Sequence, residues 1–190
     1  YVQTSGVLKR IAVKLSKICN DLRLLSSGPR TGINEINLPR LQPGSSIMPG
    51  KVNPVIPEVV SQVAFDIIGK DVTITMAAEA GQLELNVMEP IIAFSLANGI
   101  HRLRQAMRTL QDRCVSGITA NKERCRSMVE NSIGIITALN PYLGYETSAS
   151  IAKEALETGG SVLDIVLARN LLSREKLDDI LAPEHMINRK

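Results

Sequence analysis

Residues 89–114 read EPIIAFSLANGIHRLRQAMRTLQDRC, and this stretch carries the clearest structural signal in the chain. Its large apolar side chains recur at intervals of three or four residues, the spacing that brings them to one side of an α-helix. They are Ile92, Leu96, Ile100, Leu103, Met107, Leu110 and Cys114. A seam sustained over this length predicts a long helix that packs in a bundle or against partner subunits. We assign this seam a packing role and no chemistry.

Two further long helices are predicted upstream of this one. In the first, apolar residues recur with helical spacing over residues 8–25, and a Ser-Ser-Gly-Pro run ends the helix. In the second, the apolar stripe extends loosely over residues 59–81, and Pro54 and Pro57 suit its first turn, where a missing N–H costs little. Residues 31–54, between the two, are rich in Gly, Pro, Asn and Ser and longer than an ordinary connection.

Beyond Gly117 the pattern changes to short helical stretches, and no segment of the chain sustains the period-two alternation of a strand. We expect helices over 121–129, 147–157, 161–169 and 173–181, with Ser161 and Ser173 as caps of the last two. The predicted fold class is therefore all-α, with long helices of a central helix bundle followed by a small helical carboxy-terminal domain. The predicted boundaries are 1–117 for the bundle part and 118–190 for the small domain.

Composition and charge exclude several functional classes. The net charge of +3 over 190 residues, without a basic stripe, argues against nucleic acid. No apolar run approaches the ~20 residues of a membrane span. The three cysteines, Cys19, Cys114 and Cys125, have no metal-ligand spacing and fit a reduced, cytoplasmic protein. The chain begins with Tyr1, with helical periodicity already running by Val7, so we expect an amino-terminal domain that is absent here.

Residues 44–54, GSSIMPGKVNP, concentrate reactive and polar groups in a loop shaped by two glycines and two prolines. Ser45 and Ser46 offer hydroxyls, Lys51 a cation and Asn53 an amide donor. Such groups suit a carboxylate or a developing oxyanion. The loop is not a P-loop, because five residues separate its glycines and Val52, rather than Ser or Thr, follows the lysine.

This loop resembles the signature loop of the aspartase/fumarase superfamily, whose members eliminate an amine or water to give fumarate. Two other stretches are more similar to the aspartate ammonia-lyases of that superfamily: residues 55–60, VIPEVV, and residues 77–90, AAEAGQLELNVMEP. Class II fumarases tend to carry Asn-Phe where this chain has Gln82-Leu83. The resemblance covers the whole chain.

The resemblance implies a homotetramer built around a many-helix bundle, with active sites shared between subunits. It also implies a reaction without cofactor or metal, in which ammonia is eliminated from L-aspartate to give fumarate through an aci-carboxylate. By position in the motif, Ser45 matches the general base and Glu58 a supporting catalytic carboxylate. The substrate-binding positions are Ser46, Lys51, Val52 and Asn53. His101 and His185 match no catalytic segment.

Three hypotheses remain open from the sequence: an ammonia-lyase acting on L-aspartate, a fumarate hydratase, and a helical oligomerisation piece without activity of its own. On the first two hypotheses, this chain alone is expected to be inactive. The resemblance implies that the site also needs a substrate-binding Thr/Ser segment and a His segment, and both would lie upstream of this chain. Each loop residue also has a plainer reading. A Ser-Ser pair after glycine is commonly a turn or cap, and Glu58 in a first helical turn is explained by the helix dipole alone.

Overall fold

The computed structural model describes residues 1–42, 47–48, 52–182 and 185. It divides the chain into two compact units, residues 1–121 and 122–190. The predicted all-α class is confirmed, since helices make up most of the described chain. The prediction of no sheet needs one correction, because β1 (Ile36–Asn37) pairs antiparallel with β2 (Thr119–Ala120). Strands of two residues are too short to show alternation.

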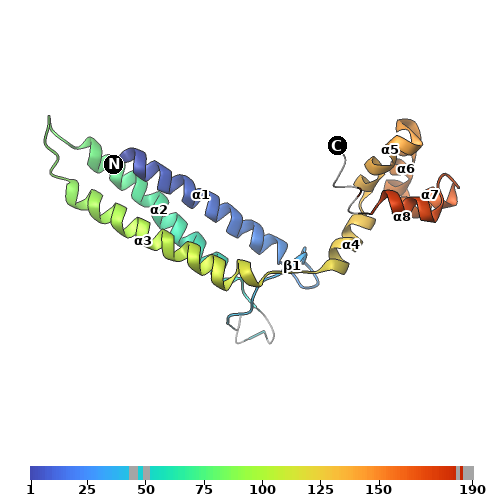
Figure 1. Ribbon diagram of the computed structural model, residues 1–190, viewed down its shortest axis with the longest axis horizontal. Coiled ribbons are helices and arrows are strands. Elements are labelled where there is room, and N and C mark those ends of the chain that lie inside the picture. The colour runs from blue at the N-terminus through green and yellow to red at the C-terminus, as the bar shows by residue number, and fades with distance from the viewer. Residues whose placement is uncertain (43–46, 49–51, 183–184, 186–190) are drawn as a thin grey trace. The chain divides into compact units, whose positions relative to one another are not determined.

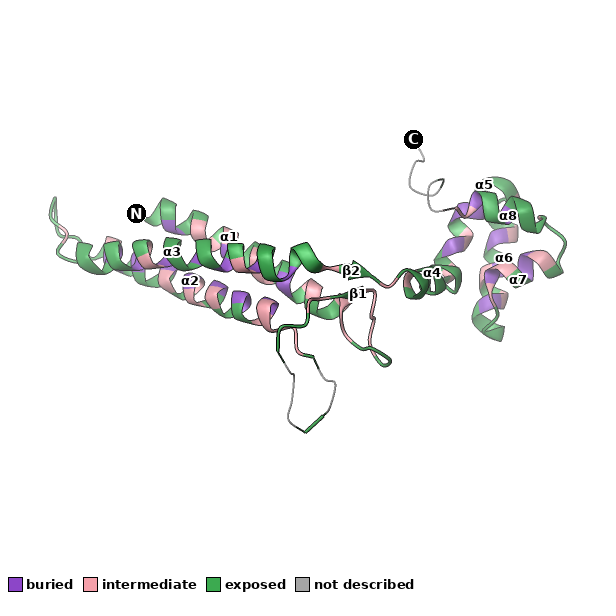
Figure 2. Ribbon diagram, turned by 60° about the horizontal axis from the view of Figure 1, so that its bottom comes forward, coloured by how far each residue is buried: buried purple, intermediate pink, exposed green. Residues whose placement is uncertain are grey.

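The first unit consists of three long helices, α1 (Val2–Leu25), α2 (Val55–Glu79) and α3 (Glu89–Arg113), with a 3₁₀ turn at Val115–Gly117. Helix α2 lies between the other two and packs along both, whereas α1 and α3 contact each other little (Figure 1). The helices therefore form an open layer with buried residues along the inner seams, shown in purple in Figure 2. Cys19, Val60 and Leu110 pack together at the end of the layer where α1 ends and α2 begins.

Helix α3 is found where the sequence predicts it, but its buried face differs from the predicted seam. The buried side is Ile92, Ser95, Gly99, Leu103, Ala106 and Leu110. Ile100 and Met107 are 49% and 40% exposed. The reason is close helix packing: a Cβ on Gly99 would stand 3.3 Å from Cδ1 of Ile67 in α2. Small residues thus share the buried side with Ile92, Leu103 and Leu110, while Ile100 and Met107 remain exposed.

The second unit is built from short helices, and its core is aliphatic. The elements are α4 (Lys122–Glu130), a 3₁₀ turn (Ile133–Ile135), α5 (Ile136–Leu143), α6 (Tyr145–Thr158), α7 (Val162–Ala168) and α8 (Arg174–Ile180). Leu139, Ile151, Val166 and Leu177 are fully buried in it. Ser161 accepts a hydrogen bond from the N–H of Leu163 at 3.2 Å, and Ser173 one from Lys176 at 3.3 Å, which confirms both predicted caps. Helix α5 was not predicted, because Asn140-Pro141, which lies inside it, is a typical breaker pair.

In the described part of the chain, no helix combines the length and hydropathy that crossing a membrane requires.

A polar contact holds α1 against α2 at the end of the layer where α1 begins. Asp71 of α2 is 9% exposed and accepts hydrogen bonds from Ser5 Oγ at 2.7 Å and Lys9 Nζ at 2.9 Å. The hydrogen bonds from Ser5 and then Lys9 lower the pKa of the Asp71 carboxyl below its ordinary value. Both helices are thereby fixed in register at a buried position.

Asp71→Asn is expected to destabilise the full-length protein by about 1–2 kcal/mol at pH 7, because it removes the charge from a buried hydrogen-bonded group. A carboxyl whose pKa is lowered in the folded state contributes stability that is complete above its unfolded pKa of about 3.9. That contribution is lost as the pH falls through the lower folded value. The difference in unfolding midpoint between wild type and Asp71→Asn should therefore shrink as the pH falls.

Asp66→Asn is the matched control, because Asp66 lies on the same helix in more exposed ion pairs with Lys70 and Arg102. Such pairs contribute about 0–1 kcal/mol, so its effect should be smaller. A difference in unfolding midpoint for Asp71→Asn that did not change with pH would contradict the stabilising role of the Asp71 carboxylate.

Candidate active site

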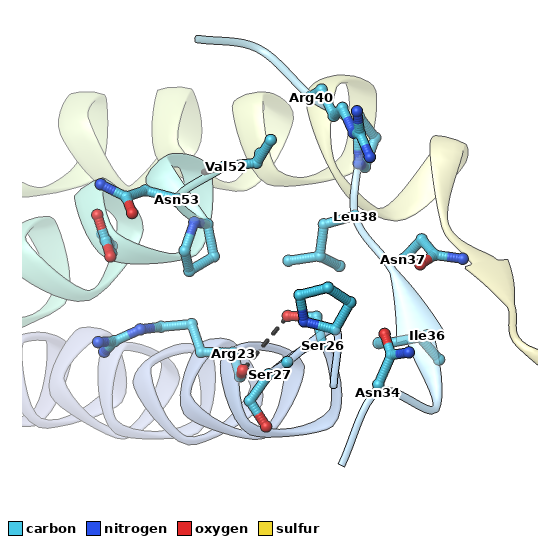
Figure 3. Close-up of a pocket in the computed structure, with 15 residues that line it drawn as sticks. Arg23, Ser26, Ser27, Asn34, Ile36, Asn37, Leu38, Arg40, Val52 and Asn53 are labelled. Carbon is cyan, nitrogen blue, oxygen red and sulfur yellow. Dashed lines mark hydrogen bonds between the residues drawn. The ribbon is translucent and has the colours of Figure 1, made fainter. Parts of the chain in front are cut away.

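A cavity of about 500 Å³ lies in the first unit, where the end of α1, residues 34–40 and the start of α2 come together (Figure 3). Its walls combine charged groups, amides and small apolar surfaces. The lining residues are Arg23, Ser26, Ser27, Gly28, Pro29, Asn34, Ile36, Asn37, Leu38, Pro39, Arg40, Val52, Asn53, Pro54 and Glu58.

Three of the predicted site residues line this cavity: Val52, Asn53 and Glu58. The other three, Ser45, Ser46 and Lys51, lie outside the described residues. Val52, which follows Lys51 in the sequence, is the first described residue after it and lines the cavity.

The start of α2 fixes the positions of Asn53 and Glu58. The carbonyl of Asn53 accepts a hydrogen bond from the N–H of Val55 at 2.9 Å, and the carbonyl of Pro54 accepts one from the N–H of Glu58 at 3.2 Å. Glu58 lies in the first turn of α2, where a carboxylate is favoured by the helix dipole. The Glu58 side chain is half-buried, and within the described residues it has no ion-pair partner. It therefore lines the cavity as a carboxylate that pairs with no cation among the described residues.

Two arginines of the cavity were not predicted. Arg23 lies in the last turn of α1 and donates a hydrogen bond to Asn20 at 3.4 Å, while Arg40 lies at the end of the segment 34–40. In Figure 3 the guanidinium of Arg23 and the amide of Asn53 extend to the same side of the view, opposite Asn37. A cation in a last helical turn is explained by the dipole alone, so the sequence held no functional signal for Arg23.

The two serines of the cavity wall complete the end of α1. Ser26 Oγ donates to the carbonyl of Leu22 at 2.7 Å. Ser27 Oγ donates to the carbonyl of Leu24 at 2.6 Å and accepts from the N–H of Ile33 at 3.1 Å. These hydroxyls are committed to the backbone and are poor candidates for a base.

The remaining titratable candidates lie away from the cavity lining. His101 is on the exposed side of α3, and Nδ1 of His185 lies 2.6 Å from the carbonyl of Asp179 in the second unit. Burial, followed by the charge of Cys114, raises the pKa of the Cys19 thiol to about 11, which keeps it neutral. Over the described ranges, no three His, Cys, Asp or Glu side chains are grouped as metal ligands.

The stretch 77–90 lies at the opposite end of α2 from the cavity, about 37 Å away at 1.5 Å per residue. Asn86 Nδ2 donates to the carbonyls of Ala77 at 3.0 Å and Ala78 at 3.3 Å, and Asn86 Oδ1 accepts from the N–H of Met88 at 2.8 Å. Asn86 thus builds the turn between α2 and α3. This stretch does not line the cavity of its own chain.

Taken together, the cavity offers two guanidinium groups, three amides and one carboxylate beside apolar surface. Cations and amides suit the carboxylates of a small acid, and the single carboxylate suits an ammonium group.

Comparison with known proteins identifies the family of this chain. Residues 1–69 match the family described as Lyase, and residues 135–188 match the family described as Fumarase C C-terminus. The fold superimposes on fumarate lyase:delta crystallin from Brucella melitensis with a TM-score of 0.93 at 55% identity, over 99% of this chain and 41% of that one. It superimposes on the class II fumarase from Schistosoma mansoni with a TM-score of 0.87 at 40% identity, over 98% and 39%. The chain belongs to the aspartase/fumarase superfamily.

Within that superfamily the chain is similar to aspartate ammonia-lyases. It is 67% identical to that of Pseudomonas canavaninivorans over 98% of this chain, 64% identical to that of Helicobacter pylori over 99%, and 58% identical to that of Escherichia coli K12 over 99%. The chain spans about 40% of the length of these curated relatives.

Proposed function

We propose that the full-length protein is an aspartate ammonia-lyase that reversibly eliminates ammonia from L-aspartate to give fumarate. The observation that carries this proposal is the 58–67% identity to curated aspartate ammonia-lyases over nearly the whole chain. The cavity chemistry supports it, because L-aspartate carries two carboxylates and one ammonium group.

In the proposed reaction, Ser45 as alkoxide takes a proton from the β-carbon, and the C–H electron pair moves into the adjacent carboxylate to form an aci-carboxylate. That intermediate then forms the carbon–carbon double bond and expels ammonia from the α-carbon with the C–N electron pair. The second negative charge on the carboxylate is the main energetic obstacle, and preorganised donors act on it. Lys51 and Asn53 supply those donors, Ser46 and Val52 complete the substrate contacts, and Glu58 supports the constellation. The reaction needs no cofactor or metal.

We further propose that the protein is a cytoplasmic homotetramer whose active sites are shared between subunits. Apolar side chains on the outer faces of the helical layer support an assembly through this layer, because large exposed apolar patches mark interfaces. Phe65, Val72 and Met76 on α2 are 58%, 60% and 61% exposed, and Phe94 on α3 is 62% exposed. In this proposal the chain supplies one wall of an active site and is inactive alone.

The test is the rate of fumarate formation, followed by ultraviolet absorbance, when the full-length protein receives L-aspartate or L-malate. We expect fumarate to form from L-aspartate and not from L-malate. Turnover of L-malate instead would replace the proposal by fumarate hydration. Turnover of neither substrate, with a large assembly seen by light scattering, would favour the helical oligomerisation piece.

A further inference from the structure

An amide network joins two parts of the first unit that lie far apart in sequence. Asn121 Nδ2 donates to the carbonyl of Asn34 at 2.9 Å, to Asn34 Oδ1 at 3.1 Å and to Asn37 Oδ1 at 3.2 Å. In return, Asn37 Nδ2 donates to Asn121 Oδ1 at 2.6 Å and to Thr119 Oγ1 at 3.2 Å. The backbone N–H of Asn121 donates to the carbonyl of Glu35 at 2.8 Å. One asparagine thus satisfies polar groups of three residues in a short segment.

The segment captured by Asn121 has little regular structure of its own. Asn34 has a φ of 54°, in the left-handed region that a residue with a side chain seldom adopts. Besides the short pairing of β1 with β2 and the bond from the N–H of Asn121, a backbone hydrogen bond runs from the N–H of Glu35 to the carbonyl of Leu25 at 2.9 Å. The double contact of Asn121 with Asn34 holds this unfavourable conformation in place.

The same segment is one wall of the candidate cavity. Asn34, Ile36, Asn37, Leu38, Pro39 and Arg40 all line it, facing the wall that carries Asn53 and Glu58. Asn121 lines no part of the cavity and can influence it only through this wall. A second contact acts in the same place: a Cβ on Gly117 would stand 2.6 Å from Cγ of Pro39. Residues 117–121 therefore support the cavity wall from behind.

We infer that Asn121 is a positioning residue, which sets the wall formed by residues 34–40 against Asn53 and Glu58. The kinetic part of this inference rests on the proposed function, whereas the structural part does not. Asn121 is also the last residue of the first unit, and α4 begins at the next residue, Lys122. Misplacing groups in an active site by about 1 Å can lower the rate about 100-fold.

The test compares Asn121→Ala and Asn121→Asp in the full-length protein. Alanine removes the whole network, and aspartate removes the donor to Asn34 while keeping the shape and the acceptor for Asn37. Both variants are expected to lower kcat/KM for L-aspartate about 10- to 100-fold. Peptides covering residues 33–40 should exchange their amide hydrogens faster, while those of α3 should not change.

Asn131→Ala is the matched control, because Asn131 makes two local hydrogen bonds, to the carbonyl of Ser127 at 2.7 Å and to its Oγ at 3.3 Å, in the second unit. Its kcat/KM should equal that of wild type. If Asn121→Ala does not fold, Asn37→Ser removes part of the same network and should give a smaller change in the same direction.

Kinetic constants of the Asn121 variants equal to those of Asn131→Ala would overturn the positioning role, even if exchange of 33–40 increased. Unchanged amide hydrogen exchange in residues 33–40 would overturn the inference that Asn121 holds this segment in place. An inactive wild type would instead overturn the proposed function, and the exchange comparison would still decide the link.

Discussion

Replacing Ser45 by alanine in the full-length protein is expected to lower kcat for L-aspartate by about 100- to 10,000-fold, the range that a general base contributes. In the proposed reaction no other group of this chain takes the β-proton, and a C–H beside a carboxylate is a very weak acid. The binding groups would remain, so KM should change little by comparison. Initial rates of fumarate formation over a range of L-aspartate concentrations measure both constants.

Two serine variants give this prediction its contrast. Ser46→Ala should raise KM more than it lowers kcat, because Ser46 is proposed to bind substrate in the ground state as well as in the transition state. Ser116→Ala, at an exposed position beyond α3, should leave both constants unchanged. Wild-type turnover by Ser45→Ala would show that another group is the base.

Asn53→Ala is expected to lower kcat/KM for L-aspartate by about 100- to 1,000-fold, as the removal of a preorganised donor to an oxyanion does. Asn53 lines the cavity two residues before α2, and its carbonyl accepts a hydrogen bond from the N–H of Val55 at 2.9 Å, which fixes its backbone. Asn53→Asp should be at least as damaging, because it sets a negative charge against the developing one. The effect should fall mainly on kcat, since the second negative charge on the carboxylate exists only in the intermediate.

The outcome that would contradict this role is a pure rise in KM for Asn53→Ala, which would make Asn53 a ground-state contact only. Asn131→Ala again serves as the control for loss of an asparagine away from the cavity. Comparable losses in both variants would point to general destabilisation.

The long helices could be predicted because their apolar residues recur with helical spacing over many turns. Helix α3 shows the limit of that signal. Ile100 and Met107 have the spacing of core residues but are exposed in this chain, whereas Gly99 and Ala106 are buried and carry no apolar signal. Hydropathy reports which residues need a partner, and it does not tell whether the partner is a neighbouring helix or another surface.

The candidate site could be predicted only where its residues are contiguous in sequence. Asn53 belongs to the loop motif of residues 44–54, Glu58 follows that motif by four residues, and both line the cavity. Arg23 and Asn37 reach the same cavity from other segments, and Asn121 supports it from residues that follow α3. Their positions depend on the packing of α1 and on the pairing of β1 with β2, which no local pattern encodes. The roles proposed for Ser45, Ser46 and Lys51 rest on the motif.

The most direct test of the proposed activity runs the reaction in reverse. The full-length protein is given fumarate and ammonium together in deuterated water, and the products are identified by nuclear magnetic resonance. Ammonia and water then compete for the same double bond in one tube. The proposed ammonia-lyase should yield aspartate carrying one deuterium on its β-carbon, without malate. Accumulation of malate in place of aspartate would contradict the proposal.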